Sequence, residues 1–243
     1  FIDAESISKT LIVSETQGKL YIVSTPIGNL GDMTYRAVET LQNVPMIAAE
    51  DTRHSRKLLS HYGISTPLIS YFEHNRFTRI PKIIDHLNSG KDLAVITDAG
   101  TPGISDPAYK LVREALLHDI TVESIPGASA SLAALVSSGL PTDRFLFEGF
   151  LPPKKGRKAR IARVENEQST LIYYESPKRL QRTLKQLLEG LGNRPAVVAR
   201  ELTKLHEEIK RGTLSELLTY FTTHPPKGEC VILVGKDDPN VYF

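Results

Sequence analysis

Short apolar runs alternate with amphipathic stretches along most of the chain, a pattern typical of an α/β protein. Runs of four or five residues rich in β-branched side chains indicate buried strands, and apolar positions spaced three and four apart indicate helices between them. The expected strands are 19–23, 46–49, 68–71, 92–96 and 121–125, followed by 145–148, 170–174, 196–199 and 231–234. The expected helices begin near residue 34 and after residue 52, and then cover 80–87, 108–117, 132–137, 178–188 and 214–221.

This alternation is interrupted at residues 139–144 and then starts again, so the sequence predicts two α/β domains. We expect an N-terminal domain over residues 18–140 and a C-terminal domain over 141–237, with tails at 1–17 and 238–243. A chain of 243 residues is long enough to form two modest hydrophobic cores.

The composition of the chain limits the kinds of partner and the cellular compartment that we expect. The formal net charge is only +2, so a nucleic-acid partner must be bound by a local basic patch. The single cysteine, Cys230, excludes an intramolecular disulfide and fits a reducing compartment. No apolar run approaches the length of a membrane span, and the N-terminus lacks the pattern of a signal peptide. We therefore expect a cytoplasmic protein that has no membrane partner.

The segment 98–107 is the most informative loop, because it follows a buried strand and precedes the expected helix 108–117. Ligands bind at the carboxyl ends of strands in open α/β sheets. Gly100 and Gly103 allow the backbone to approach a ligand closely. The alternative is ordinary turn chemistry, with Asp106 as the N-cap of the helix, and for Asp106 we prefer that interpretation.

A second strand end, residues 50–57, combines two acids, two arginines, a lysine and a histidine. One structural explanation is that Thr52 or Ser55 caps the following helix and that the helix dipole favours an acid, Glu50 or Asp51, near its start. This explanation accounts for one of the two acids but less easily for both. We expect a functional role for at least one residue here, while His54 alone is more readily explained as structural.

Two further junctions are rich in small residues. The pattern of residues 28–31 lacks the glycine spacing of a dinucleotide fingerprint, and no P-loop is present. Residues 126–131 start a helix with small side chains, which suits either a ligand against the backbone amides or close packing of the helix on a sheet.

Six basic side chains fall within residues 154–163, with no acid among them. A solvated helix face is the usual explanation of such a run. The unbalanced charge instead favours contacts with phosphates, which give affinity but no sequence choice. Few aromatic residues are interleaved, so a stacking platform for single strands is not indicated.

Seven motifs occur in a fixed order: TPIGNL at 25–30, AEDTRH at 49–54, DAGTP at 98–102 with SDP at 105–107, PGASA at 126–130, YYESPKRL at 173–180, ARELTK at 199–204 and KGE at 227–229. With these motifs the chain resembles the ribosomal RNA small subunit methyltransferase I family, a branch of the tetrapyrrole-methylase (class III) superfamily. The resemblance covers about residues 18–236.

The resemblance implies two α/β domains of the tetrapyrrole-methylase type, with S-adenosyl-L-methionine bound in the cleft between them, in a homodimer. It also implies 2′-O-ribose methylation of a cytidine in the decoding region of 16S rRNA in the small ribosomal subunit, without a metal. Carried over by motif position, the residues implied to contact the methyl donor are Pro26, Asp98, Gly100, Thr101, Ile104, Ala128, Ser129, Ala130, Tyr174, Leu202 and Cys230.

Methyl transfer from a sulfonium requires alignment of the acceptor oxygen and exclusion of water. A ribose 2′-hydroxyl is a poor nucleophile, so a base or an orienting hydrogen-bond acceptor helps. The catalytic candidates are Glu50, Asp51 and Asp98, of which we favour Asp51, with Arg53 holding a neighbouring phosphate. The expected RNA contacts are Arg53, His54, Lys154, Lys155, Arg157 and Lys158.

Two other functions remain open from the sequence. An enzyme of the same fold that methylates a tetrapyrrole ring would not need the basic run at 154–163. A non-catalytic RNA- or ribosome-binding module would bind RNA without the donor, which the glycine-proline loops argue against. Members of the family commonly continue with a small helical C-terminal extension, whereas the resemblance of this sequence to the family ends near Lys236. If that extension assists docking, we expect normal donor binding and weaker RNA binding.

Overall fold

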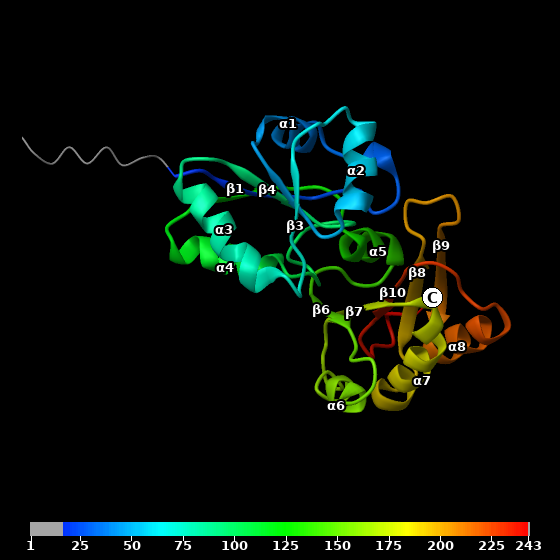
Figure 1. Ribbon diagram of the computed structural model, residues 1–243. Helices are drawn as coiled ribbons and strands as arrows, with labels where there is room; N and C mark the ends of the chain where they lie inside the picture. The colour runs from blue at the N-terminus through cyan, green and yellow to red at the C-terminus, as the bar shows by residue number, and fades with distance from the viewer. Residues whose placement is uncertain (1–16, 243) are drawn as a thin grey trace, which may run out of the picture. The chain divides into compact units, whose positions relative to one another are not determined.

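A computed structural model describes residues 17–242. The predicted tails at 1–17 and 238–243 include residues 1–16 and 243, which lie outside the described residues. The chain forms two compact units, which are described separately (Figure 1). Unit 1 contains the described residues up to Thr25 together with Met33–Gly127, and unit 2 contains Pro26–Asp32 and the described residues from Ala128 onward.

Unit 1 is built on a parallel sheet with the strand order β3-β2-β4-β1-β5. Its strands are β1 (Leu20–Val23), β2 (Ile47–Ala49), β3 (Leu68–Ser70), β4 (Leu93–Ile96) and β5 (Val122–Ile125). All five strands predicted for the first half of the chain are confirmed. The near-continuous apolar sequences of the inner strands β1, β2 and β4 are typical of strands that are covered on both faces.

Helices cover both faces of this sheet. They are α1 (Tyr35–Asn43), α2 (Thr52–His61), α3 (Arg76–Asn88) and α4 (Ala108–Leu117). Along β4, Leu93 and Val95 pack with α3 and α4, whereas Ala94 and Ile96 pack with α1 and α2. The connections that leave β1 and β4 therefore run to opposite faces, which makes the adjacent ends of these two strands a topological switch point.

Unit 2 contains a mixed sheet with the strand order β6-β7-β10-β8-β9, in which only β6 and β7 are parallel. Its strands are β6 (Phe145–Phe150), β7 (Thr170–Glu175), β8 (Pro195–Arg200), β9 (Glu208–Thr213) and β10 (Cys230–Val234). Strand β9 was not predicted. It lies at the edge of the sheet and carries charged residues, which are common on edge strands and hide the apolar alternation.

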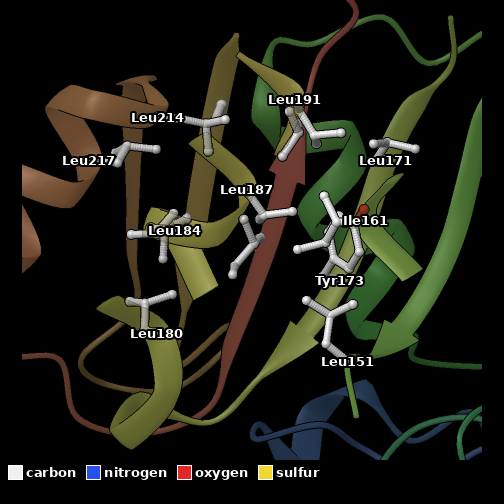
Figure 2. Packing of buried hydrophobic residues seen from close by; sticks show 14 of the residues in the cluster. Leu151, Ile161, Leu171, Tyr173, Leu180, Leu184, Leu187, Leu191, Leu214 and Leu217 are labelled. Atoms are coloured by element: carbon white, nitrogen blue, oxygen red, sulfur yellow. The ribbon is translucent and has the colours of Figure 1, made fainter. Parts of the chain in front are cut away.

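The helices of unit 2 lie on the two faces of its sheet. They are α5 (Ala130–Ser138), α6 (Arg157–Ala162), α7 (Leu180–Leu191) and α8 (Leu214–Thr223), and short 3₁₀ turns occupy Leu30–Asp32 and Pro177–Arg179. One core joins α6, α7 and α8 to one face of the sheet, with Ile161, Leu184 and Leu217 among its members (Figure 2). Residues of the described part of the chain form no helix that is long and apolar enough to cross a membrane.

Helix α5 covers the other face of this second sheet. Its residues Ala134 and Leu135 share a buried cluster with Ile172 of β7, Val197 of β8 and Leu233 of β10. The division between the compact units therefore falls at Gly127, ahead of α5. The sequence pattern had placed it at residue 140, after this helix, because the glycine and proline of the following loop mark a break in the chain whereas packing partners do not.

Candidate functional site

The carboxyl ends of β2 and β4 carry three acids on unit 1. Ala49 of β2 and Ile96 of β4 are register partners in the parallel sheet, so the segments that follow them leave the same edge of the sheet. Glu50 and Asp51 follow β2, and Asp98 follows β4. We refer to these three residues as the carboxylate cluster. The structure thus brings together the three acids that were predicted as catalytic candidates.

Hydrogen bonds hold the carboxylate cluster in place. The backbone N–H of Asp51 donates to Asp98 Oδ1 at 3.1 Å, and the hydroxyl of Thr97 donates to Glu50 Oε2 at 2.8 Å. Thr97 was not among the predicted site residues, although its position between β4 and Asp98 was a usable signal. Within the described residues, no group of three or more histidine, cysteine or acidic side chains is arranged to hold a metal ion.

Asp51 is also the N-cap of α2. Its Oδ1 accepts hydrogen bonds from the backbone N–H groups of Arg53 at 2.8 Å and His54 at 3.4 Å. The prediction that Thr52 or Ser55 supplies this cap was wrong, because Thr52 is already the first residue of the helix and Ser55 lies within it. Hydrogen bonds from the Arg53 side chain, followed by those from the backbone, lower the pKa of Asp51 to about 2. Asp51 is therefore a persistent anion that accepts hydrogen bonds.

The loop after β4 is fastened to the end of β1. Thr25 and Gly100 exchange two backbone hydrogen bonds, at 2.9 and 3.0 Å, and the hydroxyls of Ser24 and Thr101 lie 2.9 Å apart. Sequence reasoning missed Ser24, which directly follows β1. Since the ends of β1 and β4 form the switch point of the sheet, this fastened loop occupies the position where such sheets bind ligands.

The same loop requires left-handed backbone at Gly100 (φ 84°), Gly103 (φ 92°) and Ser105 (φ 70°). Asp106 fixes its second half by accepting hydrogen bonds from the N–H groups of Gly103 and Ala108, both at 2.8 Å. The N-cap position of α4 belongs to Pro107, not to Asp106 as predicted, but Asp106 still satisfies the N–H of the first helical residue. Gly100 and Gly103 therefore allow the loop to adopt left-handed backbone conformations that other residues disfavour.

Seven residues of unit 2 were implied to contact the donor, and four of them share one apolar cluster. Ala128, Ala130, Tyr174 and Leu202 all belong to, or pack against, the apolar cluster on the α5 face of the sheet. The Tyr174 hydroxyl accepts a hydrogen bond from the N–H of Ser131 at 3.2 Å, in the first turn of α5.

Cys230 belongs instead to the core on the other face of that sheet, with α7 and α8. Burial raises the pKa of its thiol to about 12, so the thiol is neutral at ordinary pH. Pro26 is buried, and Ser129 is the N-cap residue of α5.

Only some of the basic side chains at 154–163 are exposed at the surface. Lys154, Lys155 and Lys158 are exposed. Arg157 is not: it is 2% exposed and donates to Gln186 Oε1 at 2.7 Å, Thr183 Oγ1 at 2.6 Å and the carbonyl of Pro152 at 3.0 Å. The prediction that Arg157 contacts RNA was therefore wrong, because its guanidinium is committed inside unit 2.

Comparison with known proteins identifies the class of protein to which the chain belongs. Residues 19–218 match the family model of Tetrapyrrole (Corrin/Porphyrin) Methylases. The solved uroporphyrin-III-C-methyltransferase from Thermus thermophilus shares the fold, with a TM-score of 0.65 at 18% identity over 90% of this chain and 95% of that one. The predicted α/β fold of the tetrapyrrole-methylase type is thereby confirmed.

Two relatives are much closer in sequence. The chain is 54% identical over 221 residues to the ribosomal RNA small subunit methyltransferase I of Synechocystis sp., covering 90% of this chain and 79% of the relative. It is 49% identical over 226 residues to the protein of the same name from Halalkalibacterium halodurans, covering 92% and 78%. The chain belongs to the ribosomal RNA small subunit methyltransferase I family and is a methyltransferase, as its seven motifs predicted.

Proposed function

We propose that the chain transfers the methyl group of S-adenosyl-L-methionine to the 2′-hydroxyl of a cytidine in the decoding region of 16S rRNA, in the small ribosomal subunit. The observation that carries this proposal is the 54% identity to a relative named ribosomal RNA small subunit methyltransferase I. The proposal includes a homodimer, which the family resemblance implies, and a cytoplasmic location, as expected for an enzyme that acts on ribosomal RNA.

Unit 1 offers a chemically suitable set of groups for the donor. The carboxylate of Asp98 uses one oxygen to accept from Asp51 N–H and retains capacity for further donors such as ribose hydroxyls or an ammonium group. A Cβ added at Gly103 would meet no atom within 4 Å, so the loop borders open space there. When bound, S-adenosyl-L-methionine supplies an electrophilic methyl group on a sulfonium.

We assign donor contacts on unit 1 to Asp98, Gly100, Thr101 and Ile104. The donor contacts that we propose on unit 2 are Pro26, Ala128, Ser129, Ala130, Tyr174, Leu202 and Cys230. For Cys230 the buried neutral thiol supports only an apolar or backbone-mediated contact.

The carboxylate cluster gives the acceptor hydroxyl its orientation. We assign to Asp51 the hydrogen bond from the ribose 2′-hydroxyl, because its carboxylate stays ionised at all ordinary pH values. A weakly basic carboxylate is sufficient for this role. The hydroxyl proton becomes strongly acidic as the new oxygen–carbon bond forms, and a weak base can then accept it. Arg53 is largely exposed beside Asp51 and is placed to contact a phosphate of the same strand. The exposed Lys154, Lys155 and Lys158, together with His54, are proposed as further RNA contacts.

Replacing Asp98 by asparagine is expected to weaken donor binding by roughly 10- to 100-fold, because a hydrogen bond to a charged group is lost. The carboxamide of the Asp98→Asn variant would still accept from the N–H of Asp51, so the loop should keep its path. Isothermal titration with S-adenosyl-L-methionine measures the change, and the unfolding temperature of the variant serves as the control. Unchanged donor affinity would remove Asp98 from the donor site.

Methyl transfer itself is tested with labelled S-adenosyl-L-methionine and small ribosomal subunits that lack the modification, with naked ribosomal RNA alongside. We expect label to enter the RNA of the subunit only when the protein is present. Donor binding without transfer to either RNA substrate would contradict the proposed function, and so would failure to bind the donor.

A further inference from the structure

Helix α2 has one buried face and one basic face. Ser55 and Leu59 are 1% and 2% exposed and turn toward the core of unit 1. Residues three and four positions apart share a helix face, and the opposite face carries exposed basic side chains. These are Arg53, Arg56, Lys57 and His61, which we call the α2 basic face.

Little of this charge is compensated locally. No aspartate or glutamate occurs between Asp51 and Glu73. Arg53 pairs with Asp51 at 3.1 Å, whereas the side chains of Arg56 and Lys57 form no hydrogen bond or ion pair with any residue that the structure describes. Some other cations of the described residues are paired, as Arg200 is with Glu208 and Lys204 with Glu201. The α2 basic face is therefore an unbalanced positive surface.

The α2 basic face starts next to the carboxylate cluster of the same unit. The helix begins at the N-cap Asp51, and at a rise of 1.5 Å per residue the basic face extends over about 12 Å from Arg53 to His61. Three carboxylates at the start of the helix repel the phosphates of an approaching RNA strand. A row of cations that leads away from them offsets this repulsion and attracts the phosphates next to the reacting ribose.

We propose that the α2 basic face binds the phosphate backbone of the RNA strand that carries the methylated ribose, with Arg56 and Lys57 as its main contacts. This inference rests on the proposed function. Contacts to phosphates position the strand and carry no sequence information. The face thus sets the affinity and register of the RNA, and base recognition must come from other residues.

The test compares two double variants of the full chain. Arg56→Gln/Lys57→Gln removes two charges from the α2 basic face. The matched control, Lys82→Gln/Arg113→Gln, removes two exposed cations from α3 and α4, which cover the opposite face of the same sheet. All four positions are on helix surfaces, where glutamine is well tolerated.

We expect the α2 variant to raise the KM for RNA by roughly tenfold, with kcat within about twofold and the donor affinity unchanged. The slope of the logarithm of RNA affinity against the logarithm of salt concentration should become less steep by about 0.7–0.9 for each lost contact. The control should match the unsubstituted chain in KM and in salt slope.

An α2 variant that keeps the original KM and salt slope, while the unsubstituted chain methylates RNA, would overturn this inference and leave the proposed function intact. A loss shared equally by the α2 variant and the control would also overturn it, since a general reduction of charge would then be the cause. If the unsubstituted chain methylates no RNA, the proposed function is wrong, and this inference, which rests on it, is wrong as well.

Discussion

Replacing Asp51 by asparagine is expected to lower kcat for methyl transfer by roughly 100-fold or more, the usual contribution of a group that assists proton movement. Asparagine is nearly as good an N-cap as aspartate, so the new side chain can still accept from the N–H groups of Arg53 and His54 and keep the start of α2. What the substitution removes is the negative charge that receives the acceptor hydroxyl. Single-turnover transfer to RNA, with donor affinity measured separately, isolates this effect.

Asp85 provides a matched control, because it is an exposed acid on α3 of the same unit. Asp85→Asn should leave kcat unchanged. Since the pKa of Asp51 is about 2, ionisation of this group should cause no fall in kcat between pH 8 and pH 5. If Asp51→Asn turned over at nearly the original rate with the fold intact, the assignment of Asp51 would be wrong.

Glu175→Gln is expected to destabilise the protein by about 3–5 kcal/mol, the range observed when one partner of a buried ion pair is removed. The side chain of Glu175 is fully buried at the end of β7 and lies 3.7 Å from the guanidinium of Arg157, which is also buried. Its oxygens accept from Arg179 and Thr183, both at 2.7 Å. Glutamine keeps the size of the side chain and removes the charge that compensates Arg157.

Unfolding followed by far-ultraviolet circular dichroism measures this loss. Glu189→Gln is the matched control, because Glu189 forms an exposed pair with Lys185 on α7 of the same unit. Surface pairs of this kind contribute about 0–1 kcal/mol. Equal stability of the Glu175 and Glu189 variants would show that the buried network around Arg157 does not stabilise unit 2.

The parallel sheet of unit 1 was predictable because its strands are short apolar runs and its helices have clear amphipathic spacing. The carboxylate cluster was predictable for a related reason. Residues that follow parallel strands leave the same edge of the sheet, so Glu50, Asp51 and Asp98 could be named together as candidates, whereas only the structure shows that β2 and β4 are neighbours. Strand β9 was not predictable, since charged residues interrupt its apolar pattern.

Long-range partners account for the main error in the candidate site. Arg157 belongs to a basic run, and nothing in its neighbourhood along the chain indicates that it is buried. Its partners Thr183, Glu175 and Gln186 come from β7 and α7, so only the packed fold reveals them.

The cap of α2 was misplaced for a local reason. Asp51, Thr52 and Ser55 lie within five positions of one another, and all three have side chains that can cap a helix. The sequence alone therefore leaves the first residue of the helix open.

The proposed function requires that the methyl group goes to a ribose oxygen of a cytidine. The most direct measurement is alkaline hydrolysis of the labelled subunit RNA, followed by identification of the labelled product. Alkali cleaves the backbone only where a free 2′-hydroxyl is present, so the account predicts label in one alkali-resistant dinucleotide whose first nucleoside is cytidine. Label in ordinary mononucleotides would place the methyl group on a base and contradict the account.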